Sequence, residues 1–271
     1  MKLVWHTIVP TSSGGRLRES QPLWNLMRDY AARVVDPATT VEFMFMDPGM
    51  RTLAHPYAAL ANERWLVIHA LAAERAGADG FLTAYFGDLG LESLQSALQI
   101  PVVGSLQSAL AVAANIGRRA GIVTVHPGYV HQLELAILRS GLGGRLVDHR
   151  PVRYWPMDWQ EEVGNALEGK PDQLLDAFTA VADTLIADGA DVIIGVGQVF
   201  GAFLAKYDVR VIGSTGVPIV DIGASGLKML ELMVSMRQTL GLRKSEAIGS
   251  PFRTLSPDLF AAATEMLRSQ A

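Results

Sequence analysis

The sequence predicts an α/β fold of two similar domains, each a mainly parallel sheet flanked by helices, with a pocket between the domains. Short apolar runs bounded by turn residues alternate with longer amphipathic stretches. This alternation is typical of parallel sheets covered by helices on both faces. The apolar runs are continuous and rich in valine and isoleucine, as in strands buried on both sides. One stretch is echoed later in the chain, which indicates two related halves.

Strands are predicted where an apolar run of a few residues stops at a turn-forming residue. In chain order these runs are residues 3–9, 41–45, 80–83, 102–103, 121–125, 192–196 and 219–220. Helices are predicted where apolar residues recur within the longer stretches between the strands. In chain order these stretches are residues 22–35, 58–76, 90–98, 107–116, 129–140, 171–188 and 226–240.

The echo joins AGADGFLTAYFGD, beginning at Ala76, with DGADVIIGVGQVFG, beginning at Asp188. Each is followed by a helix and then by a short apolar strand containing proline, IPVVG from Ile100 and VPIVD from Val217. Ligands of open parallel sheets lie at the carboxyl ends of the strands. We therefore expect both echoed turns to face one shared cleft.

The domain limits follow from this arrangement. We predict a first α/β domain of residues 1–112 plus 222–271 and a second α/β domain of residues 113–221. The helix after Val220 would then return to complete the first domain.

The composition excludes several classes of function. Hydrophobic residues make up 49% of the 271 residues and charged residues 18%, which is typical of a well-buried globular protein. A net charge of −4 provides no basic face for nucleic acid. Without cysteine there is no disulfide, thiolate metal site or cysteine nucleophile. No histidine spacing suggests a metal site, and GVGQVFG lacks the third glycine of a dinucleotide fingerprint, so no cofactor is expected.

The sequence also bears on location and partners. No stretch approaches about 20 uninterrupted apolar residues, so no membrane span is expected. The first run, MKLVWHTIVP, lacks the pattern of a signal peptide, and we expect a cytoplasmic protein. The expected partner is a small-molecule substrate. Apolar helix faces, notably in residues 58–76, are compatible with a homo-oligomer.

Several segments resemble one known family. The stretch AYFGDLGL, which contains Tyr85, resembles the CFGDPGL signature of hydantoin and allantoin racemases, within the aspartate/glutamate racemase superfamily. Further segments resemble that family in the same order along the chain: IVPTSS from Ile8, GIVTVHPGYVHQLE from Gly121, GADVIIGVGQ from Gly189 and VPIVDIGASGLKMLE from Val217. The resemblance covers most of the chain and implies two α/β domains with a small-molecule pocket between them.

The family's usual chemistry implies two facing cysteines, one that removes a proton from carbon and one that returns a proton on the opposite face. A thiol suits this work because its pKa can be tuned towards neutrality. Carried over by position, the first cysteine falls on Tyr85 and the second on Gly197, so neither thiol is present. The two changes could be coupled if the Tyr85 ring leans into the space that glycine leaves.

Two residues are candidates for the proton chemistry. Tyr85 has an ordinary pKa near ~10, so it would act as a donor or general acid unless its neighbours lower that pKa. His126 follows a predicted strand directly and precedes a proline turn, and an imidazole is suited to acid or base work. The alternatives are an aromatic ring that fills space and a histidine that stabilises a turn.

The substrate-binding candidates lie at the predicted strand ends. The loop of Pro10, Thr11, Ser12 and Ser13 offers hydroxyls and backbone amides for a carboxylate or imide carbonyl, or alternatively a cap for the next helix. The other candidates are Phe86, Gly87, Thr124, Gly197 and Gln198. Gln198 adjoins the missing second cysteine and could bind a ligand amide or carbonyl. Asp88 is expected to cap the helix at 90–98.

Three hypotheses of function follow. The first is a cysteine-less enzyme of this superfamily that acts on a small carboxylate, hydantoin or related cyclic amide by asymmetric acid–base chemistry. It would be an isomerase, a lyase or decarboxylase, or an amide hydrolase. The second is a true racemase with replacement bases. The third is a non-catalytic relative that binds a small metabolite.

Overall fold

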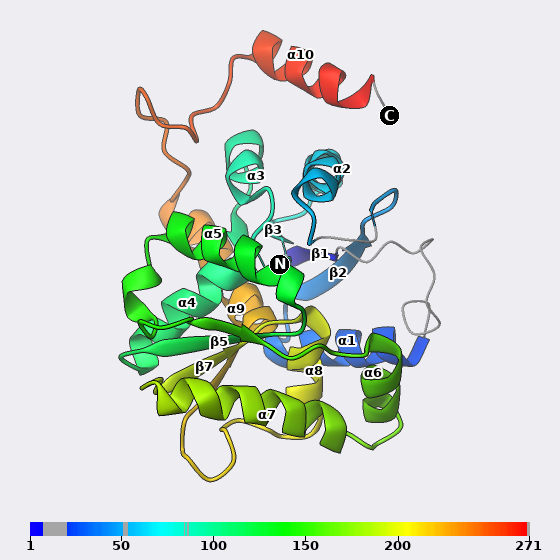
Figure 1. Cartoon of the computed structure of the whole chain (residues 1–271). Helices are drawn as coiled ribbons and strands as arrows, with labels where there is room; N and C mark the ends of the chain where they lie inside the picture. The colour runs from blue at the N-terminus through cyan, green and yellow to red at the C-terminus, as the bar shows by residue number, and fades with distance from the viewer. Residues whose placement is uncertain (8–20, 51–53, 84, 86, 270–271) are drawn as a thin grey trace.

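The chain folds around two four-stranded sheets in which every strand pair is parallel. The computed structural model describes residues 1–7, 21–50, 54–83, 85 and 87–269. Helices pack around both sheets (Figure 1). The predicted fold class, two α/β units with parallel sheets flanked by helices, is confirmed.

The first sheet has the strand order β2-β1-β3-β4. Its strands are β1 (Lys2–Thr7), β2 (Thr40–Phe45), β3 (Gly80–Thr83) and β4 (Val102–Gly104). They alternate with α1 (Gln21–Val34), α2 (Pro56–Arg75), α3 (Leu91–Ala97) and α4 (Ser105–Ile116). The central strand β1 is buried from Leu3 to Thr7, because its two faces are both covered.

The second sheet repeats this pattern with the strand order β6-β5-β7-β8. Its strands are β5 (Ala120–Thr124), β6 (Val152–Tyr154), β7 (Val192–Gly195) and β8 (Ile219–Asp221). The 3₁₀ turns η1 (Pro127–Tyr129) and η2 (Gly143–Arg145) flank α5 (Val130–Ser140), and the later helices are α6 (Trp159–Leu167), α7 (Asp172–Ala187) and α8 (Gln198–Lys206). The echoed stretches become β3–α3–β4 and β7–α8–β8, as the repeat predicts.

Helix α9 (Ile222–Leu240) follows β8 of the second sheet but packs on β3 of the first. Gly80 makes room for it, since a Cβ there would lie 2.8 Å from side-chain atoms of both Leu230 and Val234. In the same way, a Cβ on Gly226 would lie 2.7 Å from the side chain of Leu82. The exact domain limits, 1–112 plus 222–271 and 113–221, stay a prediction.

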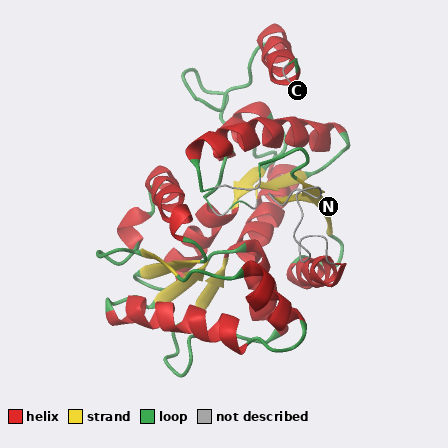
Figure 2. Ribbon diagram, turned by 45° about the vertical axis from the view of Figure 1, so that its right-hand side comes forward, coloured by secondary structure: helices red, strands yellow, loops and turns green. Residues whose placement is uncertain are grey.

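The last helix, α10 (Pro257–Arg268), stands apart from both sheets. It lies beyond α2 and α3 at one end of the molecule (Figure 1; Figure 2). Its attachment to α2 includes a hydrogen bond from Arg64 Nε to the carbonyl oxygen of Leu267 at 2.7 Å. In the described part of the chain no helix is long and apolar enough to cross a membrane.

A histidine pair, in which His6 is buried and His69 partly buried, joins β1 to α2. Nε2 of His6 lies 3.1 Å from Nδ1 of His69. Burial, and secondarily the charge of His69, lowers the pKa of His6 from 6.5 to about 3. Burial also lowers the pKa of His69. The folded protein therefore holds the His6 imidazole neutral.

This pair makes stability depend on pH. Because the folded pKa of His6 lies below the unfolded one, its stabilising contribution is present above about pH 6.5 and is lost as the pH falls towards 3. Between about pH 7.5 and about pH 5 the loss is on the order of 2 kcal/mol. Asp88 and Asp221 have raised pKa values, so their contributions to stability grow as the pH falls, opposite to that of His6. The pH dependence of the wild-type protein therefore does not report on His6 alone.

The measurement is urea unfolding of wild type and His6→Gln at both pH values. Both proteins carry the same aspartates, so the stability difference between them should move by about 2 kcal/mol in favour of the variant at the lower pH. A difference that does not change with pH would contradict a neutral buried His6.

Candidate functional site

The carboxyl ends of β5 and β7 hold two buried hydrogen-bond donors. The strands pair Val123 with Gly195, so Thr124 and Gln198 follow at the same edge of the sheet. Thr124 is fully buried and Gln198 is 9% exposed. The hydroxyl oxygen Oγ1 of Thr124 and the amide nitrogen Nε2 of Gln198 have no hydrogen-bond partner among the described residues. Buried donors usually bind a protein group, an ordered water or a ligand, so these two can receive an oxygen atom from outside the chain.

Gly197 lies between the end of β7 and Gln198, whereas Thr124 is itself the last residue of β5. Gly197 precedes the first residue of α8 and has φ 153° and ψ 123°, a conformation that side chains rarely adopt. A Cβ there would lie 3.3 Å from Cβ of Phe200 and would meet no atom of Tyr85 within 4 Å. Phe200 therefore bounds the Cβ position of Gly197 and Tyr85 does not contact it, so a coupling between Tyr85 and Gly197 stays a prediction.

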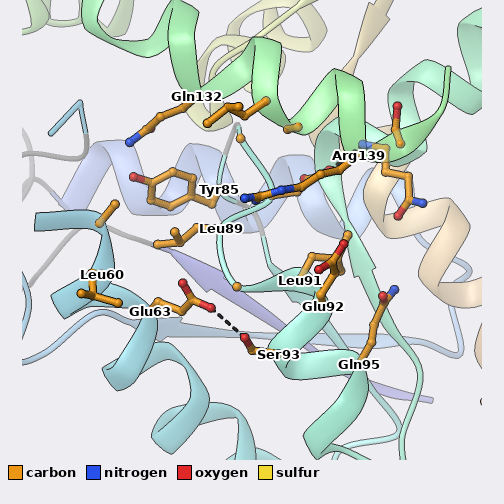
Figure 3. Close-up of a pocket in the computed structure, with 18 of the residues that line it drawn as sticks. Leu60, Glu63, Tyr85, Leu89, Leu91, Glu92, Ser93, Gln95, Gln132 and Arg139 are labelled. Atoms are coloured by element: carbon orange, nitrogen blue, oxygen red, sulfur yellow. Dashed lines mark hydrogen bonds between the residues drawn. The ribbon is translucent and has the colours of Figure 1, made fainter. Parts of the chain in front are cut away.

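Tyr85 follows β3 and is only 1% exposed. Its hydroxyl is hydrogen-bonded to the side chain of Gln132 on α5, which belongs to the second sheet's layer. Figure 3 shows the two side chains next to each other. Burial raises the pKa of Tyr85 above 10, and Tyr129 raises the pKa further, while the Gln132 hydrogen bond opposes the shift. The net effect is a raised pKa, so Tyr85 stays a neutral phenol that can donate but is a poor base.

His126 is exposed and occupies the start of the turn η1. Its Nδ1 accepts a hydrogen bond from the backbone N–H of Gly128 at 3.0 Å. This is the turn-stabilising role that the sequence left as an alternative. The His126 ring also lies 5.2 Å from the ring of Tyr129, measured between centroids.

Tyr129 therefore lies between the two catalytic candidates. It contacts His126 and is close enough to Tyr85 to raise its pKa. Sequence reasoning missed both Tyr129 and Gln132. Their signal was their spacing, since residues three apart at the start of a helix project from one face.

Asp88 is a helix cap, as expected, but for a different helix. Its carboxylate accepts hydrogen bonds from the backbone N–H groups of Leu106 at 2.9 Å and Gln107 at 2.7 Å, at the start of α4. A Cβ on Gly104 would lie 2.4 Å from the carboxylate carbon, so glycine is needed for this approach. Burial raises the pKa of Asp88 to about 7. In the other half Asp221 caps α9 through Gly223 N–H at 2.8 Å.

The remaining candidates divide into two groups. Gly87 packs on α5, where its Cβ position would lie 3.4 Å from Cβ of Gln132. Pro10, Thr11, Ser12, Ser13 and Phe86 lie outside the described residues. Within the described ranges no group of three or more histidine, aspartate or glutamate side chains is placed to hold a metal ion.

Comparison with known proteins identifies the family of the chain. The family model for Asp/Glu/Hydantoin racemase matches residues 23–230. A hydantoin racemase of Pseudomonas sp. (strain NS671) is 26% identical over 163 residues, which are 60% of this chain and 61%, less than two thirds, of that protein. A hydantoin racemase of Paenarthrobacter aurescens is 23% identical over 230 residues, 84% of this chain and 91% of that protein. The crystal structure of allantoin racemase from Pseudomonas fluorescens shares the fold, with a TM-score of 0.73, 21% identity and coverage of 95% of this chain and 98% of that chain.

Proposed function

Because the chain belongs to the Asp/Glu/Hydantoin racemase family, we propose that it is an enzyme that acts on a small carboxylate, hydantoin or related cyclic amide by acid–base chemistry from one side. The observation that carries the proposal is the pair of unsatisfied donors at the ends of β5 and β7, Thr124 Oγ1 and Gln198 Nε2. Two neutral donors fit an oxygen atom of the substrate.

The chemistry of such a substrate explains why donors are needed there. Removing a group from the carbon beside a carbonyl moves negative charge onto the carbonyl oxygen. Fixed donors that face this oxygen in a water-poor site stabilise the charge as it forms, typically by a factor of about 10² to 10³ per donor. In our proposal Thr124 and Gln198 hold this oxygen, and Gly197 lets the backbone turn between strand and helix.

Proton handling would differ from that of a two-thiol racemase. The chain has no cysteine, and Gly197 has no group that carries a proton. Tyr85 is a neutral phenol, so we propose that it donates a hydrogen bond or proton. His126 is the second candidate for this step. One-sided chemistry of this kind suits an isomerase, a lyase or decarboxylase, or an amide hydrolase.

A true racemase with replacement bases is the second candidate. The names of the curated relatives, which are hydantoin racemases, favour it. Its bases would have to come from side chains other than thiols. A homo-oligomeric state stays a prediction under either candidate.

Deuterium exchange distinguishes the one-sided enzyme from the true racemase. Single enantiomers of a 5-substituted hydantoin, aspartate and glutamate are incubated with the protein in D2O. We expect no exchange at a racemase-like rate, because both thiols are absent. Fast deuterium incorporation with loss of optical rotation would establish the true racemase instead. Product analysis of the same panel detects hydrolysis or C–C cleavage, and binding without turnover would leave a non-catalytic relative.

Two substitutions assign the proton donor. Tyr85→Phe keeps the ring, so stability should fall by about 1 kcal/mol at most, through loss of one hydrogen bond. Turnover should fall by roughly 10²-fold if the hydroxyl transfers a proton. The measurement is kcat on the substrate that the panel identifies.

His126→Ala is the companion variant. Full activity in Tyr85→Phe with loss in His126→Ala would move the role to the imidazole. Full activity in both would exclude both residues from the reaction.

A further inference from the structure

A cavity lies beside Tyr85, between α2, α3 and α5. Its volume is about 530 Å³, within the range that holds small organic ligands. Tyr85 and Gln132 form part of its lining, but Thr124, Gly197 and Gln198 do not. Phe252, from the segment after α9, lines it as well. The cavity is therefore separate from the donor pair at the ends of β5 and β7.

One cation reaches into this cavity. The side chain of Arg139 on α5 extends across it towards Tyr85 (Figure 3). Among the described residues Arg139 takes part in no ion pair. A guanidinium group without an ion-pair partner in the described structure can bind a ligand carboxylate through two parallel hydrogen bonds.

Two carboxylates lie in the opposite wall. Glu63 comes from α2 and Glu92 from the first turn of α3. The hydroxyl of Ser93 donates a hydrogen bond to Oε1 of Glu63 at 2.7 Å, which fixes this carboxylate at the cavity (Figure 3). An ammonium group is the cation that such a pair of oxygen-rich side chains accepts.

The rest of the lining is mixed: polar side chains, among them Asp88, Gln107 and His131, stand beside an apolar part. The apolar part includes Leu60, Leu89, Leu91 and Leu135, together with Phe252. An alkyl or aryl group placed here would leave water for an apolar wall. The cavity thus offers one anchor for a negative group, one for a positive group and a surface for an apolar side chain.

We propose that this cavity binds a free α-amino acid with an apolar side chain. Arg139 holds its carboxylate, Glu63 and Glu92 hold its ammonium group, and the leucines contact its side chain. The proposal does not depend on the reaction at the strand ends. Because Tyr85 and Gln132 border the cavity, a bound amino acid also touches the pair that orients the Tyr85 hydroxyl.

Isothermal titration of the full chain tests this site. The ligands are both enantiomers of leucine and phenylalanine. Leucinamide, which lacks the carboxylate, and N-acetylleucine, which lacks the ammonium group, are the chemical controls. We expect one amino acid bound per chain, with a Kd below about 1 mM for the preferred one and at least tenfold weaker binding of both controls.

Variants locate the site. Arg139→Gln and Glu63→Gln should each weaken binding at least tenfold, whereas the exposed residues Arg145 and Glu134 lie outside the cavity and their glutamine variants should bind normally. Thr124→Val should also bind normally. The proposal is overturned if no amino acid binds at about 10 mM, if Arg139→Gln has no effect, or if Thr124→Val abolishes binding.

Discussion

Replacing Thr124 with valine is expected to make the protein more stable and less active. The Thr124 hydroxyl is fully buried without a partner in the described structure, so valine removes an unsatisfied polar group and should stabilise the fold by about 1 kcal/mol. If the hydroxyl holds the substrate oxygen, turnover should fall by about 10²-fold or more. Gln198→Leu should likewise raise stability and lower turnover. Urea unfolding and kcat, measured on the same preparations, check both effects.

Ser108→Ala is the matched control. Its buried hydroxyl has a partner, because it donates to the carbonyl oxygen of Gly104 at 2.7 Å. Its removal should cost stability and leave kcat unchanged. If Thr124→Val instead destabilises the protein and keeps full activity, the hydroxyl has a structural role and the proposed oxygen site is wrong.

Asp88→Ala is expected to cause the largest loss of stability, about 3 kcal/mol. The carboxyl group is buried and accepts two backbone hydrogen bonds at the start of α4, so alanine leaves buried N–H groups unpaired and a space beside Gly104. Asp88→Asn retains one acceptor oxygen and should lose less. The midpoint of urea unfolding measures the effect.

Asp191 provides the comparison. It accepts similar bonds from the backbone of Arg118 and Arg119, at 2.8 to 3.0 Å, but is exposed. Asp191→Ala should be milder, because water replaces the lost acceptor. Equal losses of stability in the two variants would mean that burial does not strengthen the capping hydrogen bonds of Asp88.

The sequence predicted the central strands and most helices because apolar runs with turn residues at both ends are strong local signals. It missed β6, an edge strand of three residues with a partly exposed pattern, which offers little such signal. It also missed α10, which has no buried residues and packs mainly against α2. Its start, Ser256 followed by Pro257, was nevertheless a typical helix-start pattern.

The site was predicted less completely than the fold. Strand ends placed Thr124 and Gln198 at one edge, since position along a parallel strand is a local property. The side-chain environment of Tyr85 was not predictable, because Tyr129 and Gln132 approach it from the other half of the chain. The helix that Asp88 caps was misassigned as well, although α4 belongs to the same half of the chain. A carboxylate chooses among nearby helix starts by tertiary geometry, which the sequence order of the helices does not specify.

The return of α9 to the first sheet has a consequence for how the chain is made. All four strands of the first sheet are synthesised by residue 104, but the helix that covers Gly80 and Leu82 does not begin until Ile222. The strands of the second sheet are synthesised during that interval, while one apolar face of the first sheet remains in water. Such a face is prone to association with other chains, so newly made protein should need chaperone protection until residues 222–240 emerge.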